Sequence, residues 1–253
     1  MRTGVVVQAR LGSSRLPGKV LLPLGDDHVL AHVLRRCQAI PGVDVVCCAV
    51  PAGLADDPVA EAARQSGSFV VRGPEADVLE RYRLAVDALG LDVVMRVTSD
   101  CPLIDPTVCA AVLALLRASG AEYACNNAPP SWPHGLDCEV MTASALRRSA
   151  RLAERSWQRE HVTPWLRTHP GVARANLAMS PAISATAVRQ RWTLDTPRDL
   201  AFLRAVFCRL PRGSAGWGWR APLSVVDAEP ALLQINAGAD RLEGLKKSMK
   251  GAA

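Results

Sequence analysis

The fold is decided by the stretch VVVQARLGSSRLPGK, residues 5–19. Its first three residues are β-branched valines, which favour a strand. The strand runs directly into a loop rich in Gly, Ser, Arg and Pro. In open α/β sheets, ligands bind beyond the carboxyl ends of the strands, which is where this loop lies. The stretch therefore predicts the first strand of an α/β domain with a ligand loop at its end.

The same alternation continues through the first part of the chain. Residues 92–97 are mostly apolar, as in parallel strands that are buried on both faces. Strands followed by helices predict an α/β fold with a doubly wound, mostly parallel sheet. The expected strands are 5–7, 44–50, 69–71, 92–97, 122–125, 136–141 and 189–194, and the expected helices are 29–40, 56–65, 77–89, 106–119 and 143–154.

The composition changes after Leu210, which predicts two parts. Residues 1–210 form the predicted catalytic domain. Residues 211–218 are rich in Gly, Pro and Trp and are expected to be a linker, and 229–251 are expected to form a polar, partly helical tail with a basic end. Residues 129–133 hold three prolines and a tryptophan, which indicates a rigid excursion over a site or an interface.

Charge and aromatic content limit the partners. The net charge is +6, which suits a nucleic acid, an acidic membrane or a polyphosphate. The basic residues are scattered and aromatics make up only 4% of the chain, which argues against a nucleic-acid surface. No apolar run approaches the roughly 18 residues of a membrane span. We expect no nucleic acid and no membrane.

The eight cysteines suit an intracellular protein. They include no paired C-x-x-C spacing, so a structural zinc site is not expected. Cys47 and Cys48 are adjacent in an apolar run and are expected to be buried small hydrophobes. Residues 1–7 are too short for a signal peptide. Reduced thiols and the lack of such a peptide predict a cytoplasmic location.

The loop at residues 8–19 has the chemistry of an anion cradle. Its glycines allow main-chain N–H groups to approach an anion closely. Its serines donate hydrogen bonds, and its arginines grip phosphate oxygens in pairs. The spacing is neither Walker A nor the dinucleotide motif, and an ordinary basic surface loop is the alternative. The residues concerned are Arg10, Gly12, Ser13, Ser14, Arg15, Gly18 and Lys19.

Two aspartates follow apolar, strand-like runs. Asp100 comes after 92–97, and Asp195 follows 189–194. Carboxylates at the carboxyl ends of strands meet phosphates in this architecture, and Mg²⁺ prefers carboxylate and phosphate oxygens. The residues alone leave an alternative open, because Asp is a common helix N-cap at such junctions.

Six segments occur in an order typical of one family. They are QARLGSSRLPGK at 8–19, RGPEADVLERY at 72–82, RVTSDCPLIDP at 96–106, HGLDCEV at 134–140, REHVTP at 159–164 and RWTLDTPRDL at 191–200. The chain resembles the CTP-dependent cytidylyltransferases that activate sugar acids, such as acylneuraminate and Kdo. Within them it is similar to the SpsF-like branch of spore coat polysaccharide biosynthesis. EPALLQIN at 229–236 is also similar to that branch.

The resemblance implies a GT-A-like three-layer fold and transfer of CMP from CTP to an acceptor, with release of pyrophosphate. It implies Mg²⁺ on Asp100 and Asp195, and it gives catalytic roles to these two residues with Arg10 and Lys19. The nucleotide-binding residues it implies are Ala9, Arg10, Gly12, Ser13, Arg15, Lys19, Arg72, Asp77 and Thr98.

The resemblance also assigns the acceptor half of the site. Asp137 and Glu139 are expected on one face of a short strand, and solvated edge polarity is the alternative. Two histidines are candidates for acceptor binding or proton handling, although a lone histidine is more often structural. The predicted acceptor residues are His134, Asp137, Glu139, Arg159, Glu160 and His161. Trp132 and Trp192 either wall the pocket or pack.

Three other functions stay open at this point. A phosphonate or a phospho-alditol is an alternative acceptor for CTP chemistry. A glycosyltransferase shares the fold, but Ser99-Asp100-Cys101 is not the Asp-x-Asp motif common in that class. A non-catalytic nucleotide-binding protein would be expected to lose part of the loop or an aspartate. The expected partners are CTP and a small anionic acceptor, and the Pro/Trp loop and basic tail are compatible with a homodimer.

Overall fold

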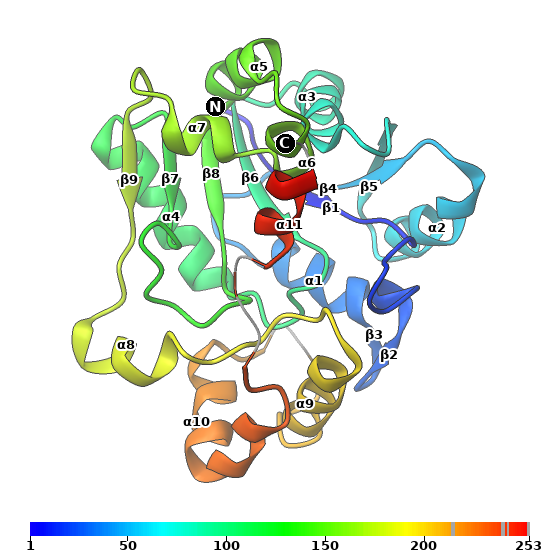
Figure 1. The fold of residues 1–253 in the computed structure, drawn as a ribbon, viewed down its shortest axis with the longest axis vertical. Helices are drawn as coiled ribbons and strands as arrows, with labels where there is room; N and C mark the ends of the chain where they lie inside the picture. The colour runs from blue at the N-terminus through cyan, green and yellow to red at the C-terminus, as the bar shows by residue number, and fades with distance from the viewer. Residues whose placement is uncertain (214–215, 239–240, 242, 252–253) are drawn as a thin grey trace.

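The computed structural model describes residues 1–213, 216–238, 241 and 243–251. A seven-stranded sheet has the order β5-β4-β1-β6-β8-β7-β9 (Figure 1). β8 is antiparallel to both of its neighbours, and the other pairs are parallel. The strands are β1 (Thr3–Gln8), β4 (Val45–Pro51), β5 (Phe69–Gly73), β6 (Val93–Thr98), β7 (Tyr123–Cys125), β8 (Glu139–Thr142) and β9 (Arg174–Asn176).

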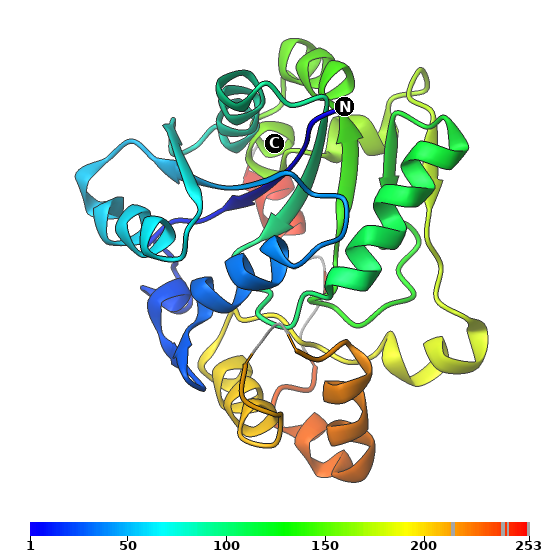
Figure 2. The same cartoon turned by 180° about the vertical axis from the view of Figure 1, so that it is seen from behind.

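Helices cover both faces of the sheet, which makes three layers (Figures 1 and 2). Side chains alternate along β1, so Val5 and Val7 join one buried cluster and Val6 joins the other. The first cluster packs under α1 (Val29–Gln38), α2 (Asp57–Gln65) and α4 (Pro106–Ser119). The second packs under α3 (Val78–Leu89), α5 (Ala143–Leu152) and α7 (Pro164–Thr168).

The C-terminal segments build a third buried cluster against the loops of the domain. Trp132 lies edge-on to Trp219, with ring centroids 5.5 Å apart, and Trp192 is fully buried. Both Trp132 and Trp192 therefore pack rather than wall a pocket. The elements around this cluster are β2 (Pro23–Leu24), β3 (Asp27–His28), α8 (Pro181–Ala187), α9 (Pro197–Phe207), α10 (Arg220–Ala228) and η3 (Pro230–Gln234).

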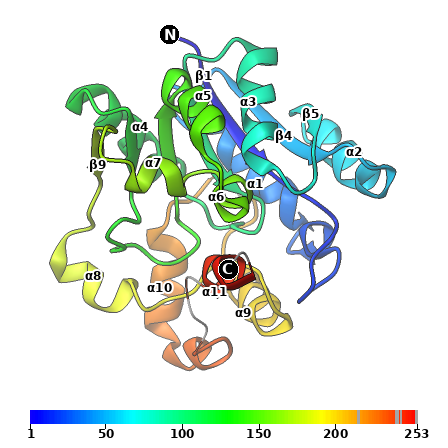
Figure 3. The same cartoon turned by 45° about the horizontal axis from the view of Figure 1, so that its top comes forward.

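Four short elements complete the fold. α6 spans Ser156–His161 and α11 spans Glu243–Gly251, and these two helices contact one another (Figure 3). The 3₁₀ turns η1 (Lys19–Leu21) and η2 (Leu54–Asp56) follow β1 and β4. The predicted tail is thus folded against the domain.

Most expected elements are found, and two strand predictions are wrong. Residues 189–194 are not a strand: only Arg191 forms an isolated bridge, to His134. The apolar side chains there fill the third cluster instead of a sheet. The expected strand 136–141 begins at Glu139, since Asp137 lies in the preceding loop. β9 has only three residues and no apolar run, so its sequence carries no strand signal.

The cysteines behave as predicted from their context. Cys47 and Cys48 are fully buried in β4, one on each side of the sheet. All eight cysteines are free thiols. In the described part of the chain, no helix has both the length and the apolar character needed to cross a bilayer.

Gly135 is a position where only glycine fits. Its φ is +116°, and a Cβ there would lie 2.6 Å from the carbonyl carbon of Trp192. We expect Gly135→Ala to lower the free energy of unfolding by roughly 2 kcal/mol or more, because both backbone strain and a backbone clash result. Gly53→Ala is the matched control, since a Cβ there meets nothing within 4 Å. Urea unfolding of the two variants measures the difference, and equal stabilities would contradict it.

Candidate active site

The loop after β1 holds a row of free backbone N–H groups. The N–H of Leu11 donates to Asp56 Oδ1 at 2.6 Å, and that of Gly18 donates to Leu11 O at 3.0 Å. Gly18 has φ +68°, which closes the loop before η1. Between these two anchors, the N–H groups of residues 12–15 donate to no group in the part of the chain that the structure describes. Four such donors beside basic side chains are an anion cradle.

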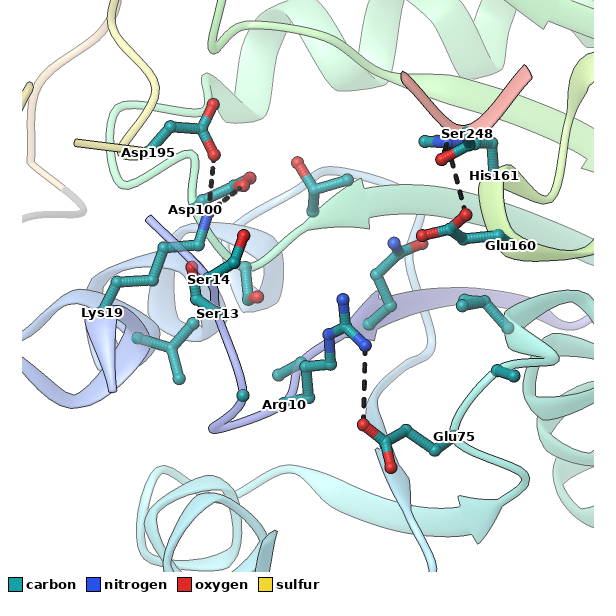
Figure 4. Close-up of a pocket in the computed structure, with 18 of the residues that line it drawn as sticks. Arg10, Ser13, Ser14, Lys19, Glu75, Asp100, Glu160, His161, Asp195 and Ser248 are labelled. Atoms are coloured by element: carbon teal, nitrogen blue, oxygen red, sulfur yellow. Dashed lines mark hydrogen bonds and ion pairs between the residues drawn. The ribbon is translucent and has the colours of Figure 1, made fainter. Parts of the chain in front are cut away.

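The ammonium of Lys19 joins this loop to both predicted aspartates (Figure 4). Lys19 Nζ lies 2.8 Å from Asp100 Oδ2 and 2.8 Å from Asp195 Oδ1, and it donates to Leu194 O at 2.7 Å. The two carboxylates therefore converge on one cation position. Asp100 and Asp195 both lie beside the loop, where carboxylates were expected to meet phosphates.

Backbone contacts bring the two aspartates together. The N–H of Leu194 donates to Asp100 O at 2.8 Å, and the hydroxyl of Thr193 donates to the same oxygen at 3.2 Å. Asp195 Oδ2 also accepts from Arg191 at 2.7 Å. The N-cap alternative is wrong for both residues, because Thr196 caps α9 and Asp105 caps α4. Both carboxylates are thus available to the cavity.

The opposite charges of Lys19 and Asp100 keep both groups ionised. Burial alone would raise the pKa of Asp100, but the Lys19 ammonium outweighs it and lowers that pKa well below its ordinary value. Burial likewise acts to lower the pKa of Lys19, and the two carboxylates overcome it and raise that pKa. Lys19 and Asp100 are therefore both charged at neutral pH.

A cavity of about 770 Å³ extends from this cluster, a size suited to a small-molecule ligand. Its lining forms three groups, which Figure 4 shows as three corners. The first, here called the phosphate corner, holds the loop with Lys19, Asp100 and Asp195. The second holds Arg10 and Glu75, whose charged atoms are 3.6 Å apart. The third, here called the α6/α11 corner, holds Glu160, His161, Lys247 and Ser248.

Most of the predicted nucleotide residues, and two of the predicted acceptor residues, line this cavity. The predicted site residues that line it are Ala9, Arg10, Gly12, Ser13, Arg15, Lys19, Thr98, Asp100, Glu160, His161 and Asp195. Burial lowers the pKa of His161, so its ring is neutral at pH 7.

The other predicted site residues lie outside the cavity lining and have protein partners. Arg72 pairs with Asp57 at 2.5 Å, and neither residue lines the cavity. Asp77 is the N-cap of α3 and accepts from Arg159 at 2.7 Å, so these two predicted residues bind one another. The residues concerned are Arg72, Asp77, His134, Asp137, Glu139 and Arg159.

Asp137 and Glu139 do not share a strand face, so that prediction is wrong. Asp137 accepts from Arg241 at 2.5 Å, and His134 Nδ1 lies 3.1 Å from Arg191. Glu139 is only 1% exposed and ion-pairs with Arg96 and Arg167. The prediction that Glu139 contacts the acceptor does not fit this geometry, because almost none of its carboxylate is exposed. Its role is to hold Arg96 and Arg167 in place.

Several lining residues were not predicted. Glu75, Arg81 and Arg96 lie within the quoted segments 72–82 and 96–106. The motifs therefore indicated these segments but not which of their side chains face the cavity. Glu243, Lys247 and Ser248 come from the tail, where a basic end was the only signal. No local pattern reveals that a segment more than 200 residues along the chain returns to the first loop.

The residues at the phosphate corner fit a divalent cation. The Lys19 ammonium occupies a point that both carboxylates reach, and carboxylate oxygens are the protein ligands that Mg²⁺ prefers. Among the described residues no group of three or more His, Cys, Asp or Glu is placed to hold a metal. Asp100 and Asp195 are the two that would hold Mg²⁺, with phosphate oxygens completing its shell.

Comparison with known proteins agrees with this geometry. The family model described as "Cytidylyltransferase" matches residues 4–210. The spore coat polysaccharide biosynthesis protein SpsF of Bacillus subtilis is 31% identical over 208 residues, covering 80% of this chain and 85% of SpsF. The structure of a cytidylyltransferase from Leptospira borgpetersenii has a TM-score of 0.86 and 27% identity, covering 95% of this chain and 100% of that one.

A more specific relative matches part of the chain. The 3-deoxy-manno-octulosonate cytidylyltransferase of Anaeromyxobacter dehalogenans is 38% identical over 117 residues, which cover 45% of this chain and 47% of that one. Its name states both the nucleotide chemistry and the sugar acid on which that enzyme acts.

An anion cradle facing two converging carboxylates, at the carboxyl end of a three-layer α/β sheet, defines a nucleotidyltransferase. The chain belongs to the cytidylyltransferase family, in the branch that contains SpsF. The predicted family and the nucleotide-sugar transferase type of fold are confirmed. The glycosyltransferase and non-catalytic alternatives are set aside by this membership.

The ion pairs of Glu139 predict a pH-dependent stability. Burial raises its pKa, but Arg167 and Arg96 lower it to about 2. A carboxylate with a depressed pKa stabilises the fold above its unfolded value, and that stability is lost as the pH falls from about 4.5 toward 2. We expect Glu139→Gln to cost about 3 kcal/mol at pH 7, since two partly buried cations lose their buried anionic partner, and to cost less at pH 3.5.

Denaturant unfolding at the two pH values measures this effect. Glu61→Gln is the control, because Glu61 forms an exposed ion pair with Arg64 on the surface of α2. A Glu139→Gln variant that is as stable as this control at pH 7 would show that the buried pairs contribute nothing.

Proposed function

We propose that this enzyme transfers CMP from CTP to a sugar-acid-type acceptor and releases pyrophosphate, with Mg²⁺ as its cofactor. The observation that carries the proposal is the convergence of Asp100 and Asp195 on one cation position, beside the four free N–H groups of residues 12–15. A triphosphate and a divalent cation need these two features side by side.

The loop would bind the triphosphate through its N–H groups and cations. Arg15 reaches Asp195 at 2.9 Å and Lys19 reaches both aspartates, so each stands at the edge of the cradle. When a triphosphate binds, these cations have a more highly charged partner than a carboxylate. They would then stabilise the charge that grows on the leaving pyrophosphate.

The reaction needs positioning and charge neutralisation more than covalent catalysis. The acceptor oxygen forms a bond to the α-phosphorus as the bond to the bridging oxygen breaks. Pyrophosphate leaves with the electron pair, and the acceptor hydroxyl loses its proton to water. Mg²⁺ held by Asp100 and Asp195 would neutralise phosphate charge and favour ionisation of the attacking hydroxyl.

The choice of CTP and of a sugar acid rests on the relatives. The family is a cytidylyltransferase family, and the relative from Anaeromyxobacter acts on 3-deoxy-manno-octulosonate. The cavity supports an anionic, hydroxylated acceptor, because the α6/α11 corner offers a lysine, a carboxylate and a serine hydroxyl.

Removing either metal carboxylate should abolish turnover while the fold survives. We expect Asp100→Asn and Asp195→Asn each to lower kcat by about 100-fold or more, since charge neutralisation supplies much of such catalysis. Asp26→Asn, which changes a half-exposed aspartate outside the cavity, is the control. Pyrophosphate release, with thermal unfolding in parallel, measures both effects, and near-normal turnover in the two variants would refute the metal assignment.

A substrate panel tests the nucleotide and the acceptor together. We expect pyrophosphate release with CTP in preference to ATP, GTP and UTP, in the presence of a sugar acid such as 3-deoxy-manno-octulosonate or N-acetylneuraminate. EDTA should abolish this release and added Mg²⁺ should restore it. Turnover with a phosphonate or a phospho-alditol instead would replace the proposed acceptor, and activity that survives EDTA would exclude the metal.

A further inference from the structure

The helix α11 packs against α6 (Figure 3), and its residues Glu243, Lys247 and Ser248 line the cavity. Three residues of this segment make polar contacts that hold it there. Arg241, just before the helix, donates to Asp137 at 2.5 Å and to Trp132 O at 2.9 Å. Glu243, at its first residue, ion-pairs with Arg15 of the phosphate loop at 2.6 Å. Ser248, one turn further on, lies 3.1 Å from His161 of α6. Two residues predicted to bind the acceptor, Asp137 and His161, therefore hold the tail.

Lys247, which precedes Ser248 in α11, also lines the cavity. Every other lysine or arginine that lines the cavity already has a protein partner. Arg10 pairs with Glu75, Arg96 with Glu139, and Arg81 donates to the carbonyls of residues 74 and 75. At the phosphate corner, Arg15 pairs with Asp195 and Lys19 pairs with Asp100. Across the described residues, no partner holds the ammonium of Lys247.

The rest of the corner has the chemistry of a polyol site. Glu160 is 45% exposed and lies 3.9 Å from the neutral ring of His161. A partly exposed carboxylate accepts hydrogen bonds from hydroxyl groups. Ser156 adds a hydroxyl to the same wall. A cation with no partner among the described residues, beside hydrogen-bonding groups, matches a ligand with one anionic group and several hydroxyls.

We propose that the C-terminal helix α11 completes the acceptor site and that Lys247 binds the carboxylate of a polyhydroxylated acid. This inference rests on the proposed function, because it names the residue at which that acceptor's charge is recognised. The triphosphate would occupy the phosphate corner and the acceptor the α6/α11 corner, on the other side of the cavity (Figure 4).

Steady-state kinetics of Lys247→Ala with CTP and 3-deoxy-manno-octulosonate or N-acetylneuraminate tests the inference. We expect KM for the acid to rise about fivefold or more, which is the loss of one charge-assisted contact, with KM for CTP and kcat changed by less than about twofold. Lys247→Arg should restore most of the affinity. Lys246→Ala, which removes the neighbouring charge outside the cavity lining, is the matched control.

The outcomes separate the inference from the function. An acceptor KM in Lys247→Ala equal to that of Lys246→Ala would overturn the inference and leave the proposed function standing. A rise in KM for CTP in place of the acceptor KM would also overturn it, by placing Lys247 on the nucleotide. A wild-type enzyme inactive with every sugar acid would contradict the proposed function and the inference together.

Discussion

The site depends on one interaction, the ammonium of Lys19 held between the carboxylates of Asp100 and Asp195. At 2.8 Å from each carboxylate, it requires three distant segments of chain to meet at one point. The parallel pairing of β1 with β6 brings the first two together, and the backbone contacts of Thr193 and Leu194 bring the third. Because like charges converge there, a cation must always be present. In the proposed function, the Lys19 ammonium lies between the two carboxylates before the nucleotide binds, and a divalent metal would lie there once CTP is bound.

The fold could largely be predicted from the sequence, because its strands follow simple hydrophobic patterns. β1, β4 and β6 are largely buried on both faces, so each holds an uninterrupted run of at least three apolar residues. The failures come where tertiary packing replaces local pattern. Trp192 and Leu194 fill a cluster between loops and C-terminal helices instead of a sheet, and β9 is a three-residue strand at the sheet edge.

The site was predictable in one half only. At the phosphate corner, strand topology puts the loop after β1 near Asp100 at the end of β6. Asp195 follows no strand, and backbone contacts of Thr193 and Leu194 bring it there. The acceptor half depends on side-chain directions and on the returning tail. Glu139 is charged, yet it points into the protein because Arg96 and Arg167 surround it there. The contact between Arg15 and Glu243 spans most of the chain, and no spacing rule reaches that far.

The central claim is that the loop at residues 12–15 and the two aspartates together hold a triphosphate and its metal. A crystal structure of the enzyme with CTP and Mg²⁺ tests it most directly. We expect phosphate oxygens on the N–H groups of residues 12–15, a metal bound by Asp100 and Asp195, and the Lys19 ammonium moved from between them onto a phosphate. CTP bound elsewhere, or Lys19 still bridging the two carboxylates with no metal beside them, would contradict it.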